Sequence, residues 1–158
     1  MRLVHLAVLA LFVAAGCKSV GLIANEATST PLPTPTPIPI LLERTCLVPP
    51  ETSVELTGTM RVPANIYTRE TVYVLGIGLP NDKPDRFIPI AVDVGRGINQ
   101  VEQLPQFRYT ASQVVVRTNT KTIIQADKPI KIFGIVRFGN FTYTTAPCVV
   151  KVTKIFKP

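Results

Sequence analysis

The sequence Val54-Glu55-Leu56-Thr57-Gly58-Thr59-Met60 carries the clearest structural signal in this chain. Its apolar residues and its glycine alternate with polar residues, which is the period of a β-strand with one buried face. A glycine inside such a strand permits a sharp bend or the close approach of another backbone. We therefore expect a curved strand whose apolar face lines a core and whose other face, continued by Arg61, meets solvent.

Four later segments have the same period and are predicted to be strands. They cover residues 71–79, 86–94, 130–138 and 148–156. The turn-forming sequence Pro80-Asn81-Asp82-Lys83-Pro84 separates the first two of them. In the third, alternation places Phe138 on the same core-facing side as Ile132 and Val136.

The sequence between the strands at 86–94 and 130–138 is less regular. Residues 99–104 predict one or two helical turns, which Asn99 would cap and which would end before Pro105. Residues 113–118 and 121–125 predict an additional β-hairpin. Since no other part of the region after the prolines has a helical period, we expect the folded part to be all-β.

Five main strands with a short helical piece between the third and the fourth resemble the OB-fold, a small Greek-key barrel. The segments Val54 to Met60 and Ile132 to Val136 are similar to the first and fourth strands of that fold. The resemblance implies a five-stranded barrel in which these two strands run antiparallel. The extra hairpin at residues 113–125 departs from the OB-fold, and an immunoglobulin-like β-sandwich remains the alternative.

The N-terminus has the composition of an export signal. Arg2 supplies a positive charge, and an apolar run from Leu6 to Gly16 follows it. Eleven helical residues rise only about 16 Å, roughly half the thickness of a bilayer core. The run is therefore too short to be a stable membrane span, and we interpret residues 1–16 as a secretory signal peptide.

Small residues directly before a cysteine end this signal. The sequence Ala14-Ala15-Gly16-Cys17 resembles the lipobox of bacterial lipoproteins, although Ala14 occupies a position at which that family prefers leucine. The resemblance implies that Cys17 becomes the N-terminus, carries lipid, and holds the protein on the extracytoplasmic face of a bacterial cell membrane. The alternative is an ordinary signal peptide cleaved after Gly16, with Cys17 unmodified.

A linker is expected between the lipid and the folded part. From Pro31 to Pro39 every second residue is proline, which prevents both helix and sheet from propagating. Polyproline II is the default conformation of such a sequence, and it makes a semi-rigid spacer. The sequence thus divides into a signal peptide at 1–16, a lipid-anchored Pro/Thr-rich linker at 17–45 and a β-rich globular domain at 46–158.

The cysteine count predicts one disulfide. Of the three cysteines, lipidation of Cys17 would leave Cys46 and Cys148 as a pair in an oxidising compartment. In an OB-like barrel the start of the first strand lies near the beginning of the last, which would bring this pair together. The alternative is two unpaired, buried thiols.

Catalytic groups are sparse in the mature sequence. Removal of residues 1–16 takes away His5, the only histidine, and leaves 16 basic and 10 acidic residues, a net charge of +6. Without imidazole, the usual general base and the commonest metal ligand are both missing. We expect no metal and no cofactor, and a non-catalytic binding or assembly module. The alternative is a carboxylate-dependent enzyme acting on sugars or cell-wall polymers through a pair such as Asp93 and Glu102.

Basic and aromatic residues alternate along the second half of the domain, as they do in proteins that bind anionic polymers. The candidate ligand-binding residues are Arg108, Tyr109, Arg117, Lys121 and Arg137. Besides the membrane itself, the partners that such a surface could meet outside the cell are an anionic polymer, lipid head groups or another envelope protein.

Overall fold

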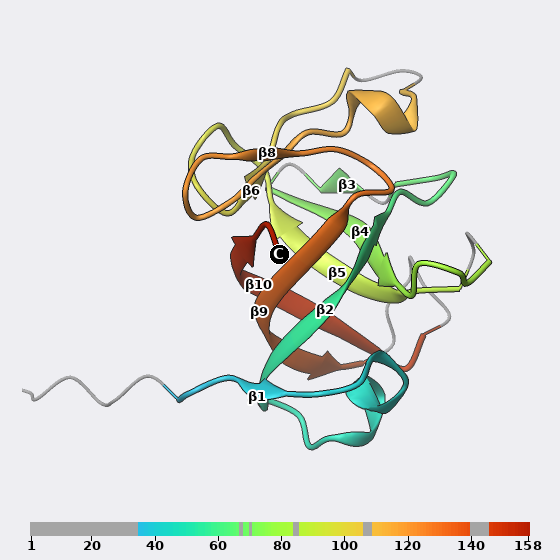
Figure 1. Ribbon diagram of the computed structural model, residues 1–158, viewed down its shortest axis with the longest axis vertical. Coiled ribbons are helices and arrows are strands. Elements are labelled where there is room, and N and C mark those ends of the chain that lie inside the picture. The colour runs from blue at the N-terminus through green and yellow to red at the C-terminus, as the bar shows by residue number, and fades with distance from the viewer. Residues whose placement is uncertain (1–34, 67, 70, 84–85, 106–108, 140–145) are drawn as a thin grey trace, which may run out of the picture. The chain divides into compact units, whose positions relative to one another are not determined.

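Five strands of the computed structural model close into a barrel (Figure 1). The structure describes residues 35–158 except 67, 70, 84–85, 106–108 and 140–145. The barrel strands are β2 (Ser53–Arg61), β4 (Val72–Gly78), β5 (Ile88–Asp93), β9 (Pro129–Phe138) and β10 (Cys148–Phe156). A short edge strand, β3 (Thr68–Arg69), lies along the start of β4.

The order of strands around the barrel is β2-β4-β5-β10-β9, and β9 returns to β2. All neighbours are antiparallel except β5 and β10, which are parallel. The first main strand therefore pairs with both the second and the fourth, as the resemblance to the OB-fold implies. The predicted class, an all-β OB-like barrel, is confirmed, and the sandwich is not formed.

Alternating residues of every barrel strand fill the core. The fully buried side chains include Leu56 and Met60 of β2, Leu75 of β4, Ile90 of β5 and Ile132 of β9. One expected member is missing, because Phe138 is 42% exposed. Although Phe138 lies on the inward-facing side of β9, it is the last residue of the strand, and we infer that β9 has by then passed the end of the core.

Glycine is required in two barrel strands because other backbones approach them closely. A Cβ added at Gly58 would lie 2.6 Å from the carbonyl oxygen of Gly78, and one added at Gly134 would lie 2.7 Å from that of Lys151. No described glycine has a positive φ. These two glycines therefore allow neighbouring strands to approach closely, and they are not needed for an unusual backbone conformation.

Between β5 and β9 the chain forms a small second sheet instead of a helix. Its strands are β6 (Gln100–Val101), β7 (Val116–Arg117) and β8 (Ile123–Ile124), paired in that order, with a 3-10 helix, η2 (Ala111–Gln113), between β6 and β7. The predicted hairpin is present as β7 and β8, with shorter strands. The prediction of a helix at 99–104 is wrong.

The physical reason for the missing helix is the conformation of Asn99. This residue has a φ of 57°, and its side-chain oxygen accepts a hydrogen bond from the Ile155 amide at 2.8 Å. It therefore fastens β10 instead of capping a helix. The next residues extend, and Val101 becomes fully buried while pairing with Val116.

At the other end of the barrel, residues that the sequence assigned to the linker are part of the fold. β1 (Ile38–Pro39) pairs in parallel with Val54 and Glu55, whereas β4 pairs with β2 only at residues 59–61. A 3-10 helix, η1 (Leu42–Leu47), follows and buries Leu42 and Thr45. The compact unit spans Thr34–Pro158 and thus begins before Cys46, because the apolar residues after the prolines pack on the barrel. Neither described helix is long and apolar enough to cross a membrane.

Candidate functional site

A disulfide joins the first and last parts of the compact unit. Cys46 in η1 is bonded to Cys148, the first residue of β10, and their Cα atoms are 5.5 Å apart. Cys148 is fully buried, so the bond is shielded on that side. The pairing predicted from the cysteine count is present. Cys17 and the signal peptide lie outside the described residues, so lipidation remains a prediction.

The candidate ligand-binding residues do not form one surface. Arg117 in β7 is paired with Glu102, and Arg137 near the end of β9 is paired with Glu51. The second sheet lies at the top of Figure 1 and the end of β9 lies at the bottom, so these two arginines are at opposite ends of the barrel. Each guanidinium has a carboxylate partner of its own. These two candidates therefore do not share one face of the barrel.

The other three candidates add little to such a surface. The hydroxyl of Tyr109 accepts a hydrogen bond from the Ile66 amide and lies 3.1 Å from the carbonyl oxygen of Ala64, so it fastens the loop after β2. Lys121 occupies a turn with a φ of 64°. Arg108 lies outside the described residues. Tyr109 is thus a structural residue, and Lys121 is an exposed turn residue.

Both carboxylates of the alternative enzyme hypothesis are in separate ion pairs. Asp93, at the end of β5, is paired with Lys151 of β10, and Glu102 is paired with Arg117. Each pair joins two neighbouring elements. The two carboxylates therefore bridge neighbouring elements, each with a basic partner of its own.

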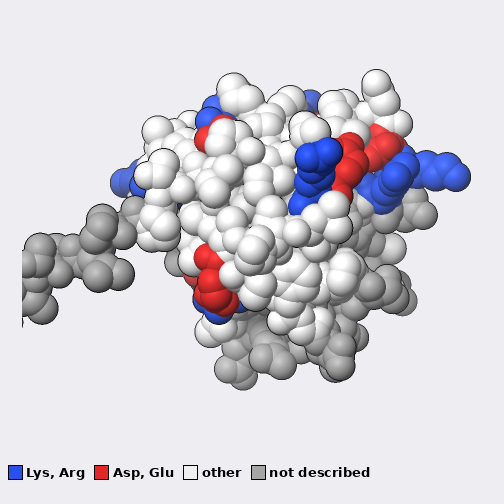
Figure 2. Space-filling view, turned by 90° about the horizontal axis from the view of Figure 1, so that it is seen from below, with Lys and Arg blue, Asp and Glu red and all other residues white. Residues whose placement is uncertain are grey.

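Charged groups on the underside of the molecule are interspersed. Figure 2 shows small groups in which basic and acidic residues lie side by side, with a wide uncharged area between them. This arrangement agrees with the ion pairs described above. A continuous basic surface, of the kind that follows a polyanion, is not visible on this face.

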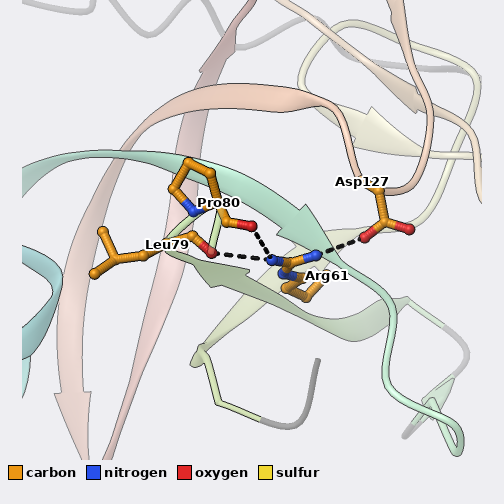
Figure 3. Close-up of polar contacts among 4 residues, drawn as sticks. All are labelled: Arg61, Leu79, Pro80 and Asp127. Atoms are coloured by element: carbon orange, nitrogen blue, oxygen red, sulfur yellow. Dashed lines mark hydrogen bonds and ion pairs between the residues drawn. The ribbon is translucent and has the colours of Figure 1, made fainter. Parts of the chain in front are cut away.

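Among the residues whose burial is described, the most deeply buried charge belongs to Arg61, which the sequence placed on the solvent side of β2. Its guanidinium donates to a carboxylate oxygen of Asp127 at 2.8 Å and to the carbonyl oxygens of Leu79 and Pro80 at 2.9 and 3.2 Å (Figure 3). Its side chain is 10% exposed and that of Asp127 is 70% exposed. Arg61 therefore ties two turns to the end of β2.

The expectation for Arg61 was wrong because pairing changes along β2. From Thr59 onward the strand also pairs with β4, and the turn after β4 folds over its outer face. Alternation predicts which side a residue is on, but it cannot predict that a distant turn will cover that side. Since both terminal nitrogens of the guanidinium have partners, we interpret Arg61 as a structural residue and not as a ligand-binding one.

An apolar groove lies between η1 and the turn that joins β4 to β5. One pocket of about 220 Å³ is lined by Leu42, Ile77, Leu79, Phe87 and Ile88, with Glu43, Asp82 and Arg86 also lining it. A second pocket of about 320 Å³ shares Leu42, Glu43 and Leu79 with the first and continues along β1 toward Glu55. We call the two together the η1 groove. Apolar walls with a few charged groups are typical of ligand sites.

Sequence reasoning missed the η1 groove because five of its lining residues were assigned to the linker: Pro39, Ile40, Leu41, Leu42 and Glu43. The signal that could have found it is the apolar run Ile40-Leu41-Leu42 directly after the prolines. Such a run has no role in a solvated spacer. It indicates that the chain has already joined the core.

A second arrangement that the sequence did not predict lies on the outer wall of the barrel. The rings of Phe133 and Phe156 have centroids 4.8 Å apart, and Lys131 lies 5.6 Å from the centroid of Phe133. Lys131 also forms an ion pair with Glu55 at 2.7 Å. Because the cation already has both an aromatic and an acidic partner, we interpret this cluster as packing between β2, β9 and β10.

No protein-family model matches the chain, and no curated protein sequence matches it. The functional argument therefore depends on the geometry described above.

Proposed function

We propose that this protein is a lipid-anchored binding or assembly module on the extracytoplasmic face of a bacterial cell membrane, without catalytic activity. The observation that carries the proposal is the way in which the chain joins the barrel. β1 pairs with β2, η1 inserts Leu42 into the core, and the disulfide fastens η1 to β10. Three independent contacts thus secure the segment next to the Pro/Thr-rich linker.

Such an attachment suits a domain that is held by its N-terminus. Chain termini fray unless they are tied down, and a linker that pulls on a frayed end would peel it from the barrel. Here a covalent bond follows the pairing of β1 within ten residues, so the barrel remains closed when its N-terminal segment is under load. A lipid on Cys17 would supply the anchor at the other end of the linker.

The η1 groove is the proposed ligand site. Its apolar residues favour a ligand with an apolar group. Its charged lining residues are the acids Glu43, Asp82 and Glu55, the last of which is paired with Lys131, against one base, Arg86. An apolar segment of another envelope protein with a nearby basic residue fits this chemistry better than a polyanion does. The module would then hold a protein partner near the membrane.

Fractionation tests the anchor. The full chain and its Cys17→Ser variant are expressed in a bacterium supplied with labelled palmitate, with Ser19→Ala as the matched control. We expect the wild type and Ser19→Ala to carry label and to sediment with membranes, and Cys17→Ser to do neither. Equal partition of all three into the soluble fraction would refute the anchor.

Site-specific photo-crosslinking in intact cells tests the groove. A photoreactive residue at Leu79, in the groove, is compared with one at Ile123, on the second sheet. We expect a discrete protein adduct from position 79 that is lost in a Glu43→Lys background, and none from position 123. Hydrolysis of an envelope polymer by the purified protein that disappears in Asp93→Asn would instead establish the enzyme alternative.

A further inference from the structure

Large apolar side chains that remain exposed are concentrated at one end of the barrel. In the described part of the chain, Ile38, Leu41 and Leu47 are 55%, 68% and 80% exposed, and Phe138 is exposed as well. We call these four residues the tether-side patch. Three of them fall within ten consecutive residues of a domain that buries most of its other aliphatic side chains.

Strand pairing and the disulfide bring the members of the patch to the same end. Ile38 is in β1, and Leu47 ends η1 directly after the half-cystine Cys46. Phe138 pairs in register with Cys148, the other half of that disulfide. β1, η1 and the end of β9 are all at the bottom of Figure 1, where the chain from the linker arrives.

The opposite end has a different surface. There the exposed apolar residues of the described chain are Ile98 and Ile123, which lie near β6 and β8. Seen from below, the molecule presents a wide uncharged area (Figure 2). In η1, which carries Leu47 of the patch, Arg44 is exposed and forms no ion pair among the described contacts, although Glu43 is its neighbour in sequence.

We propose that the tether-side patch contacts the surface of the lipid bilayer to which the protein is anchored. This inference rests on the proposed function, because it requires lipid on Cys17. Aliphatic and aromatic side chains that project beside a basic residue are the composition of a membrane-interface contact. The positive charge of the mature chain adds attraction to anionic head groups.

The argument for a bilayer, and not a second copy of the chain, is effective concentration. Residues 17–37 would span about 65 Å as polyproline II and at most about 75 Å if fully extended. A membrane at the far end of that linker is therefore always within reach, and a weak contact becomes an intramolecular one. The patch is also on the end of the barrel that the linker joins, so docking requires no reversal of the chain.

The absence of tryptophan from the chain makes the test direct. A single reporter is introduced by Leu47→Trp in the patch or, as the matched control, by Ile123→Trp on the second sheet. Both sites are more than half exposed, so the substitutions should not disturb the core. Each full, lipidated protein is reconstituted into vesicles of phosphatidylcholine and phosphatidylglycerol, with and without bromine on the acyl chains.

We expect both proteins to float with the vesicles. Emission from Leu47→Trp should shift to shorter wavelength and be quenched several-fold by brominated lipid, whereas emission from Ile123→Trp should change little. Flotation with equal, weak quenching at the two positions would overturn the docking inference and leave the anchor in place. Failure of both proteins to float would overturn the anchor as well. A blue shift of Leu47→Trp that depends on protein density and is not quenched by brominated lipid would identify a second copy as the occupant, against the proposal.

Discussion

The two ends of the barrel are closed by different means. The end that carries the second sheet is closed by non-covalent contacts: Val101, Val114, Val116 and Ile124 are buried, and Asn99 accepts a hydrogen bond from β10. At the end that receives the linker, β1 and η1 bury fewer side chains in the core. A disulfide and the two-residue parallel strand β1 hold this segment to the barrel. It also exposes the tether-side patch.

Under the proposed lipid anchor, the linker end is the one that would bear load and make contacts. Non-covalent contacts are enough to close an end that nothing pulls on. A segment that continues into a linker gains from a covalent bond, because the bond holds even when local pairing opens. Exposed aliphatic side chains grouped at the same end mark a candidate interaction surface.

The largest expected effect is loss of the disulfide. It joins residues separated by 102 positions, and the chain-entropy model gives about 4.7 kcal/mol for closing a loop of about 100 residues. We expect the double variant Cys46→Ala/Cys148→Ala to lose about 4 kcal/mol of unfolding free energy, measured by urea titration. Leu47→Ala, at an exposed neighbouring position, should stay within about 0.5 kcal/mol of wild type. A double variant as stable as the control would mean that the two ends are closed by equivalent means.

Truncation in the second sheet should have a somewhat smaller effect. Ile124 is 3% exposed, and Ile→Ala in a core costs about 2–5 kcal/mol, so we expect a loss of about 3 kcal/mol for Ile124→Ala. The adjacent, exposed Ile123→Ala is the matched control. If the two substitutions cost the same, the second sheet does not contribute to the core.

The ion pair between Arg61 and Asp127 should contribute least to the unfolding free energy. Because Asp127 is largely exposed, solvent screens its attraction to the guanidinium, and exposed pairs are worth about 0–1 kcal/mol. Asp127→Asn keeps a side chain that tolerates the positive φ of 58° at this position. Its unfolding free energy should fall by less than about 1 kcal/mol. A loss of several kcal/mol would show that the pair is effectively buried.

Periodicity was sufficient to predict the barrel strands, and the resemblance to the OB-fold implied that the first of them pairs with the fourth. Val54 to Met60 alternates in the sequence and in the structure, and the glycines at 58 and 134 mark the places where backbones meet. Periodicity failed where a residue's role depends on a distant partner. Asn99 has the side chain of a helix cap, but the Ile155 amide is the group that it binds.

The site was harder to predict than the fold. The disulfide followed from the cysteine count together with the expected barrel, which brings Cys46 and Cys148 to the same end. The basic residues were grouped because they are close in sequence, whereas the structure gives Arg117 and Arg137 separate acidic partners at opposite ends. The η1 groove joins segments on either side of β2, and no local pattern encodes that contact.

Intact mass spectrometry of the protein purified from bacterial membranes tests the central claim most directly. The account predicts a chain that begins at Cys17, heavier than the peptide by attached acyl groups, and lighter by one pair of hydrogens for the bond between Cys46 and Cys148. A mass equal to that of the unmodified chain, with or without residues 1–16, would contradict the lipid anchor and the membrane-facing role of the tether-side patch.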